Sequence, residues 1–134
     1  MDEALRSVLQ QSPILQTLET DELELLFGRA LRISVSGGQT LFQEGAPGTS
    51  LIVLTQGWVV LSRTTPTGRQ IQIGRVGPGE VLGELSLLDA APRSATATVL
   101  APVVGYEITI AQFNALLEGL HPAAIKLLHQ LNRV

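Results

Sequence analysis

The chain has 134 residues, the size of one ordinary domain, and 45% of them are hydrophobic, which excludes a disordered or fibrous protein. Its net charge of −3 argues against broad attraction to nucleic acid or acidic membranes, because such attraction depends on clustered Lys and Arg. The sequence contains no cysteine, which excludes disulfides and thiolate metal sites and favours a cytoplasmic location.

Residues 1–30 carry apolar side chains at roughly helical intervals, with a break before Pro13. The pattern predicts two short helices, the second beginning near Thr20, with acidic residues in its first turn. The buried stripe of this second helix would consist of Leu23, Leu26 and Phe27. No apolar run here is long enough for a signal peptide or a membrane span, so we expect no membrane insertion.

Residues 31–108 change to short β-branched runs that are separated by Gly and Pro. The predicted strands are 31–35, 39–43, 50–55, 58–63, 70–76, 96–100 and 103–108. We interpret Gly57 and the pair Ala101-Pro102 as turns between neighbouring strands. The pattern is typical of an antiparallel sandwich or barrel, so the expected fold class is mainly β with flanking helices.

Residues 109–134 return to a helical pattern, with Thr109 as the predicted N-cap. A break between Gly119 and Pro122 separates two predicted helices. We therefore expect a single domain, 1–134, with helices over 1–30, a β-roll over 31–108 and helices over 109–134.

The stretch 83–95 departs from the rhythm of strands and turns and carries the candidate binding chemistry. Gly83 allows close approach to the backbone, and a helical turn shortly after it would offer free N–H groups to an anion. Arg93 and the hydroxyl of Ser94 add a charged fork and a neutral donor, while Glu84 is an acceptor beside them. A phosphate that also carries a sugar hydroxyl would satisfy all of these groups at once.

These residues resemble the phosphate-binding cassette of the cyclic-nucleotide-binding domain family. The matching positions are Gly83-Glu84, Ser86, Leu87-Leu88 and Arg93-Ser94-Ala95. The stretches 38–45 and 77–80 are also similar to segments of that family, and the resemblance covers nearly the whole chain. It implies an eight-stranded β jelly-roll barrel with N-terminal helices and two C-terminal helices, called B and C.

The resemblance implies a regulatory sensor that binds cyclic AMP, or cyclic GMP, without catalytic residues, a cofactor or a metal. Glu84 would accept a hydrogen bond from the ribose 2′-hydroxyl, and Arg93 would pair with the cyclic phosphate. Amides near Leu85 and Ser86 would complete the phosphate site. A hydroxyl at Ser94 can touch both the phosphate and a guanine amino group, which leaves cyclic GMP open.

The same resemblance implies apolar walls for the base and sugar, and a lid over the base. The walls would be Leu61, Ile73, Val81 and Leu82. The lid would come from the last helix, where Arg133 or Leu131 is the nearest candidate. Ligand binding would move the cassette, which would repack against Phe113, Leu116 and Leu117, and the last helix would then close over the base.

Other classes of function are weighed against this one. Glu84 and Arg93 in isolation would be a structural ion pair of about 0–1 kcal/mol, but the surrounding motif favours a ligand site. His121 and His129 lack a nearby carboxylate cluster, so neither a metal site nor a metal-dependent jelly-roll enzyme is predicted. A degenerate jelly roll that acts through protein contacts alone stays open, as do an attached effector domain and a homodimer formed through the terminal helices. Direct nucleic-acid binding is not expected.

Overall fold

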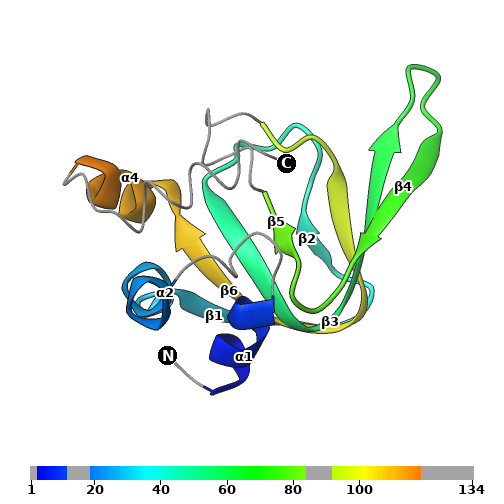
Figure 1. The fold of residues 1–134 in the computed structure, drawn as a ribbon. Helices are drawn as coiled ribbons and strands as arrows, with labels where there is room; N and C mark the ends of the chain where they lie inside the picture. Colours follow the sequence, from blue (N-terminus) through cyan, green and yellow to red (C-terminus); the bar gives the residue numbers. More distant parts are fainter. Residues whose placement is uncertain (1–2, 12–18, 84–91, 119–134) are drawn as a thin grey trace.

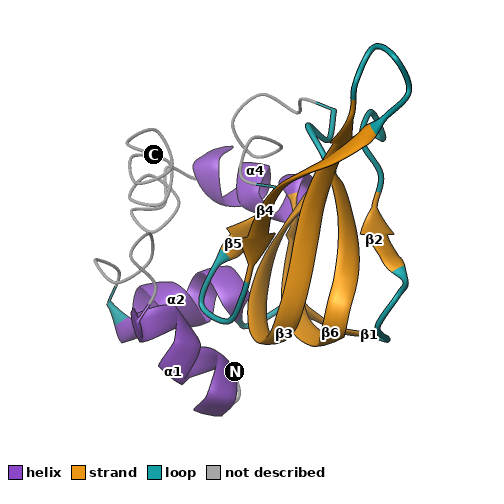
Figure 2. Ribbon diagram, turned by 90° about the vertical axis from the view of Figure 1, so that its right-hand side faces the viewer, coloured by secondary structure: helices purple, strands orange, loops and turns teal. Residues whose placement is uncertain are grey.

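The computed structural model describes residues 3–11, 19–83 and 92–118. The helices and strands follow the chain in the order shown in Figure 1. They are α1 (Glu3–Gln11), α2 (Thr20–Phe27), β1 (Leu31–Val35), β2 (Thr40–Phe42), β3 (Ser50–Thr64), β4 (Gln70–Val76), β5 (Val81–Leu82), β6 (Thr96–Thr109) and α4 (Ile110–Glu118). The three helices lie on one side of the strands, as Figure 2 shows.

The described strands form one six-stranded antiparallel sheet in the order β1-β6-β3-β4, with β2 added to β6 and β5 added to β3. Strands β3 and β6 pair over most of their length, from Ser50 opposite Thr109 to Ser62 opposite Thr96. The β3–β4 hairpin projects away from the helices (Figure 1). The two long strands therefore form the spine on which all other strands are placed.

The predicted turns at Gly57 and at Ala101-Pro102 are wrong, because β3 and β6 each continue through these positions. Gly57 has φ +88°, and a Cβ atom there would collide with the carbonyl oxygen of Pro102. The register of the β3–β6 pair shifts on both sides of this point, which identifies a β-bulge that bends the two strands together. The predicted mainly β jelly roll with flanking helices is confirmed, with six strands in the described part of the chain where eight were predicted.

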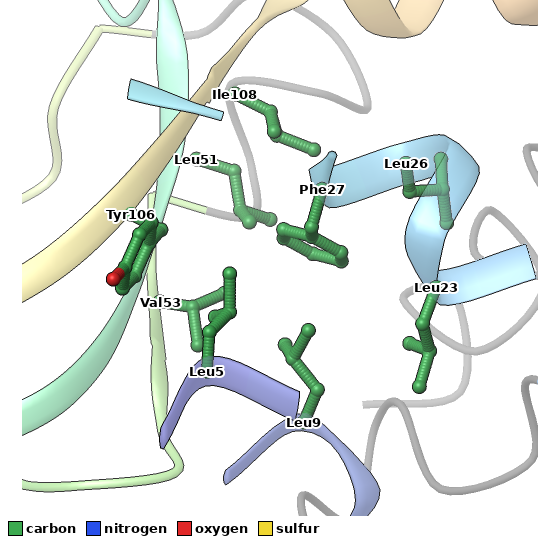
Figure 3. Close-up of a cluster of buried hydrophobic side chains, with 9 residues drawn as sticks. All are labelled: Leu5, Leu9, Leu23, Leu26, Phe27, Leu51, Val53, Tyr106 and Ile108. Carbon is green, nitrogen blue, oxygen red and sulfur yellow. The ribbon is translucent and has the colours of Figure 1, made fainter. Parts of the chain in front are cut away.

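The first half of β3 is buried on both faces and separates two apolar clusters. Because side chains alternate along a strand, Leu51 and Val53 face the helices, whereas Ile52 and Leu54 face the interior of the barrel. The helix-side cluster consists of Leu5, Leu9, Leu23, Leu26, Phe27, Leu51, Val53, Tyr106 and Ile108. Figure 3 shows the side chains of α1 and α2 converging on those of β3 and β6. The barrel cluster consists of Ile52, Leu54, Val59, Val76, Leu82, Ala97, Val99 and Val103.

The helix starts predicted near Thr20 and after Thr109 are confirmed, whereas the predicted last helix lies outside the described residues. Helix α2 begins at Thr20, but its N-cap is Glu19, whose N–H donates to Glu22 Oε1 at 2.9 Å. Thr109 caps α4 as predicted: its Oγ1 accepts from the N–H of Gln112 at 3.1 Å, and the Gln112 side chain accepts in return. Within the described parts of the chain, no helix is both long enough and apolar enough to cross a membrane.

Candidate functional site

A cavity of about 210 Å³ lies between strands β2 to β5 and the segment that leads into β6. Strands β2 to β5 supply its apolar walls, and residues 92–95 supply its polar side. The lining residues are Phe42, Leu61, Val76, Val81, Leu82, Gly83, Pro92, Arg93, Ser94 and Ala95. An apolar cavity with a few polar groups on one side is the usual form of a small-molecule site.

The main chain of Arg93 is fixed to the turn after β2. Its N–H donates to the carbonyl of Ala46 at 2.8 Å, and its own carbonyl accepts from the N–H of Gly45 at 2.8 Å. The guanidinium carbon lies 4.4 Å from the centre of the Phe42 ring, a cation–π contact. The stretch 38–45 therefore acts in this site by anchoring and supporting Arg93.

Arg93 is only 8% exposed, so its guanidinium is largely shielded from water. Nη1 donates to the carbonyl of Ser50 at 3.0 Å and Nη2 donates to Ser50 Oγ at 3.3 Å. Burial lowers the pKa of the Arg93 guanidinium from its ordinary value, and the negative charge of Glu107 acts in the opposite direction. An arginine nevertheless stays protonated at neutral pH, so the cavity wall carries a poorly hydrated positive charge.

The guanidinium of Arg93 leaves no room for a side chain at Gly83. The residue has φ +80°, and a Cβ atom there would collide with Arg93 Nη1 and lie 2.9 Å from the carbonyl oxygen of Ser50. The sequence suggested that Gly83 lets a ligand approach the backbone, whereas in the structure it is Arg93 that approaches. A side chain at position 83 would therefore displace the charged group from its position.

Ser94 is exposed beside the cavity, and its backbone is held from β3. Its carbonyl accepts a hydrogen bond from Arg63 Nε at 2.9 Å. Arg63 thus contributes to the shape of this segment from the solvent side.

The structure brings together most of the predicted site residues that it describes. Those that line the cavity are Leu61, Val81, Leu82, Gly83, Arg93, Ser94 and Ala95. Ile73 is 46% exposed on β4 and is not among the residues that line this cavity. The predicted residues that lie outside the described parts of the chain are Glu84, Leu85, Ser86, Leu131 and Arg133.

Sequence reasoning did not identify Phe42, Val76 and Pro92 as lining residues, nor the two residues behind Arg93, Ser50 and Glu107. Phe42 lies in a stretch that resembles the family, and that likeness was the signal that could have found it. Ser50 and Glu107 gave no comparable signal, because each is an ordinary polar residue in a strand.

Comparison with known proteins adds an independent line of evidence. The family model described as "Cyclic nucleotide-binding domain" matches residues 32–119. A "CRP-like cAMP-activated global transcriptional regulator" of Mycobacterium tuberculosis is 33% identical over 96 residues, which are 72% of this chain and 43% of that protein. This chain therefore spans less than half the length of that relative.

Two of the solved structures that match this chain cover most of it. The N-terminal domain of a transcriptional regulator from Streptomyces coelicolor A3(2) has 36% identity and a TM-score of 0.85, covering 94% of this chain and 90% of that one. The regulatory domain of Toxoplasma gondii PKA, in a co-crystal with cAMP, has 29% identity and a TM-score of 0.78, covering 86% of this chain and 45% of that one.

Proposed function

Because the chain belongs to the cyclic nucleotide-binding domain family, we propose that it is a regulatory sensor that binds a cyclic nucleotide in the cavity beside Arg93. The observation that carries this proposal is the buried guanidinium at the wall of an otherwise apolar cavity. A cyclic phosphate would pair with this charge, and the base and sugar would contact the walls formed by Leu61, Val81 and Leu82.

The electrostatics of Arg93 favour an anionic ligand. A phosphate would bring a negative charge and further acceptors to a guanidinium that is largely shielded from water and already bonded to Ser50. A singly charged phosphodiester fits the forked donors of a guanidinium, and such charge-assisted bonds are stronger than neutral ones. In this proposal Glu84 accepts from the ribose 2′-hydroxyl and amides near Leu85 and Ser86 complete the phosphate site, as the family resemblance implies.

Cyclic AMP is the first candidate ligand. The regulator of M. tuberculosis is named as cAMP-activated, and the T. gondii domain was solved with cAMP. Cyclic GMP is the second candidate, since the Ser94 hydroxyl lies on an exposed residue at the cavity edge. The function proposed is binding, so the nucleotide should be recovered chemically unchanged after incubation with the protein.

We further propose that binding is transmitted to the C-terminal helices, 109–134. Arg93 contacts Ser50, and Ser50 lies opposite Thr109, the N-cap of α4, in the sheet. The N–H of Ile110 also donates to the carbonyl of Thr49 at 2.9 Å, next to Ser50. In this proposal, a shift in the position of Arg93 would therefore reach the start of α4 through Ser50 and Thr49. Hydrogen exchange over 110–134 that is the same with and without nucleotide would contradict this coupling.

The proposed partners are suggested by the M. tuberculosis relative, which is named as a transcriptional regulator and of which the matched residues are 43%. An effector domain or a second copy of the chain, joined through the terminal helices, would receive the signal, and direct contact with nucleic acid is not proposed. A cytoplasmic setting is part of the same proposal and is supported by the cysteine-free sequence.

Calorimetric titration of the nucleotide-stripped protein with cyclic AMP and cyclic GMP tests the proposed function. Arg93→Ala should weaken binding by about a hundredfold, since a charge-assisted phosphate contact is lost. Arg69→Ala, which removes an exposed charge in the β3–β4 turn, is the matched control and should bind as the wild type does. If the wild type binds neither nucleotide, the chain is instead a jelly roll that acts through protein contacts.

A further inference from the structure

The guanidinium of Arg93 is the first member of a chain of hydrogen bonds that crosses from the loop before β6, over β3, and back to β6. Arg93 Nη2 donates to Ser50 Oγ at 3.3 Å, and Ser50 Oγ donates to Glu107 Oε2 at 2.6 Å. Arg93 and Ser50 are 43 positions apart, and Ser50 and Glu107 are 57 apart. The fold therefore brings together three side chains that the sequence keeps far from one another.

The direction of each bond in this chain is fixed by chemistry. A guanidinium can only donate and a carboxylate can only accept, so the hydroxyl between them accepts from Arg93 and donates to Glu107. Ser50 is only 2% exposed, so water cannot easily take over either role. Consecutive bonds of this kind polarise one another, and the carboxylate strengthens the hold of the hydroxyl on Arg93.

We propose that Ser50 and Glu107 are positioning residues for nucleotide recognition: they hold the Arg93 guanidinium at the cavity wall before the ligand arrives. The inference rests on the proposed function and deepens it. A long side chain that is already fixed loses less rotamer freedom on binding, and this preorganisation raises affinity without any contact between Ser50 or Glu107 and the ligand.

The alternative is that Glu107 acts on the ligand through its charge alone. A carboxylate on the far side of Arg93 would then oppose the binding of an anion, and neutralising it would raise affinity. If Glu107 instead positions Arg93, deleting its carboxylate should lower the affinity for the anion. Glu107→Ala separates the two cases, while Glu107→Gln removes the charge but keeps an oxygen that can accept from Ser50.

Calorimetry with cyclic AMP measures the effect. We expect Ser50→Ala and Glu107→Ala each to weaken binding by about tenfold, as loss of a hydrogen bond to a charged group implies, and Glu107→Gln to stay within about threefold of wild type. Because both residues act through one chain, the double variant should bind about as well as either single variant. Thr55→Val is the matched control, since it removes another buried hydroxyl of β3, one that donates to the carbonyl of Val104 and not to Arg93.

Unchanged affinity in Ser50→Ala and Glu107→Ala, or a loss equally large in Thr55→Val, would overturn the inference while leaving the proposed function intact. Absence of binding by the wild type would overturn the proposed function instead. The position of Arg93 has its own readout in that case: NMR signals of its guanidinium N–H groups in the nucleotide-free protein. They should be distinct in wild type and Thr55→Val and averaged in Ser50→Ala, and signals that are identical in all three would contradict the positioning role.

Discussion

Both faces of β3 near its start carry an apolar cluster, but the barrel face also carries the polar side chains of Ser50 and Glu107. On the helix side, Leu51 lies opposite Ile108 and Val53 lies opposite Tyr106, so the contact between β3 and β6 is apolar and closed by α1 and α2. On the barrel side, Ile52 lies opposite Glu107. The side chain of Ser50 bonds to Glu107 and also to Arg93.

The difference separates two regions. The helix-side cluster, called the frame below, stabilises the fold, and the barrel side, called the working part below, contains the proposed binding site. Burial of apolar area on the helix side stabilises the pairing of β3 and β6, and Tyr106 is the one member of this cluster with a polar side-chain atom. The barrel side leaves a cavity, which reduces stability, and it holds the charged Arg93 guanidinium largely away from water. The apolar packing on the helix side thus fixes the β3–β6 register, and this register places Ser50 within hydrogen-bonding distance of Glu107.

The largest expected effect comes from breaking the frame. Phe27 is 1% exposed at the centre of the helix-side cluster, and Phe27→Ala should lower the free energy of unfolding by about 3–5 kcal/mol, as measured by urea titration. Leu25→Ala, on the exposed side of the same helix, is the control and should lower it by less than about 1 kcal/mol. Equal losses in the two variants would mean that the helix-side cluster is not the main stabilising region.

An intermediate effect is expected from Gly83→Ala compared with Gly68→Ala. Both glycines have positive φ, +80° and +86°, so both variants should lose about 1 kcal/mol of stability through backbone strain. Only at position 83 would the new methyl group collide with Arg93, whereas the space around Gly68 is open. Calorimetry with cyclic AMP should show roughly tenfold weaker binding for Gly83→Ala and no change for Gly68→Ala. The same affinity in both variants would refute the role given to Gly83.

A smaller change in stability is expected from Arg93→Met, which keeps a long stem over Phe42 but removes the buried charge. Because the Met stem keeps the apolar contact but leaves the oxygens of Ser50 without the donors of Arg93, the free energy of unfolding should fall by about 1 kcal/mol while nucleotide binding is lost. Urea titration measures the free energy of unfolding, and calorimetry with cyclic AMP measures binding. A loss as large as that of Phe27→Ala would place Arg93 in the frame rather than in the working part.

The smallest effect is expected at Arg63, whose Nε holds the carbonyl of Ser94 from the solvent side. Arg63→Ala removes one exposed hydrogen bond, so stability should fall by less than about 1 kcal/mol and affinity for cyclic AMP by about two- to threefold. Stability and binding are measured as for the other variants. A loss of affinity as large as that of Gly83→Ala would show that the solvent side matters as much as the buried side.

The sequence predicted strands well where apolar runs ended at clear turn residues: β1 and β4 have the predicted limits. It failed at Gly57 and Pro102 because a glycine between two apolar runs suits a hairpin turn and a bulge equally. Only the register of the β3–β6 pair distinguishes the two, and pairing over long separations is not visible in a single sequence.

Residues that are close together within the motif also lie together in the structure, whereas their binding roles stay predictions. Gly83, Arg93 and Ser94 are close in sequence and come together in space, whereas Ser50 and Glu107 reach Arg93 only through the fold. Ile73 illustrates a second limit. The register shifts opposite it, from Leu61–Gly74 to Ser62–Gln72, so alternation along β4 does not place its side chain.

In the proposed function the charge of Arg93, rather than the shape of the cavity, selects the ligand. A comparison of cyclic AMP with adenosine tests this selection most directly. Affinities of both compounds for the wild type and for Arg93→Ala, from calorimetry and NMR titration, complete a cycle in which only the phosphate and the guanidinium change. We predict that the variant loses about a hundredfold in affinity for cyclic AMP and almost nothing for adenosine. An equal loss for both compounds would contradict the claim and would mean that Arg93 serves only to hold the cavity open.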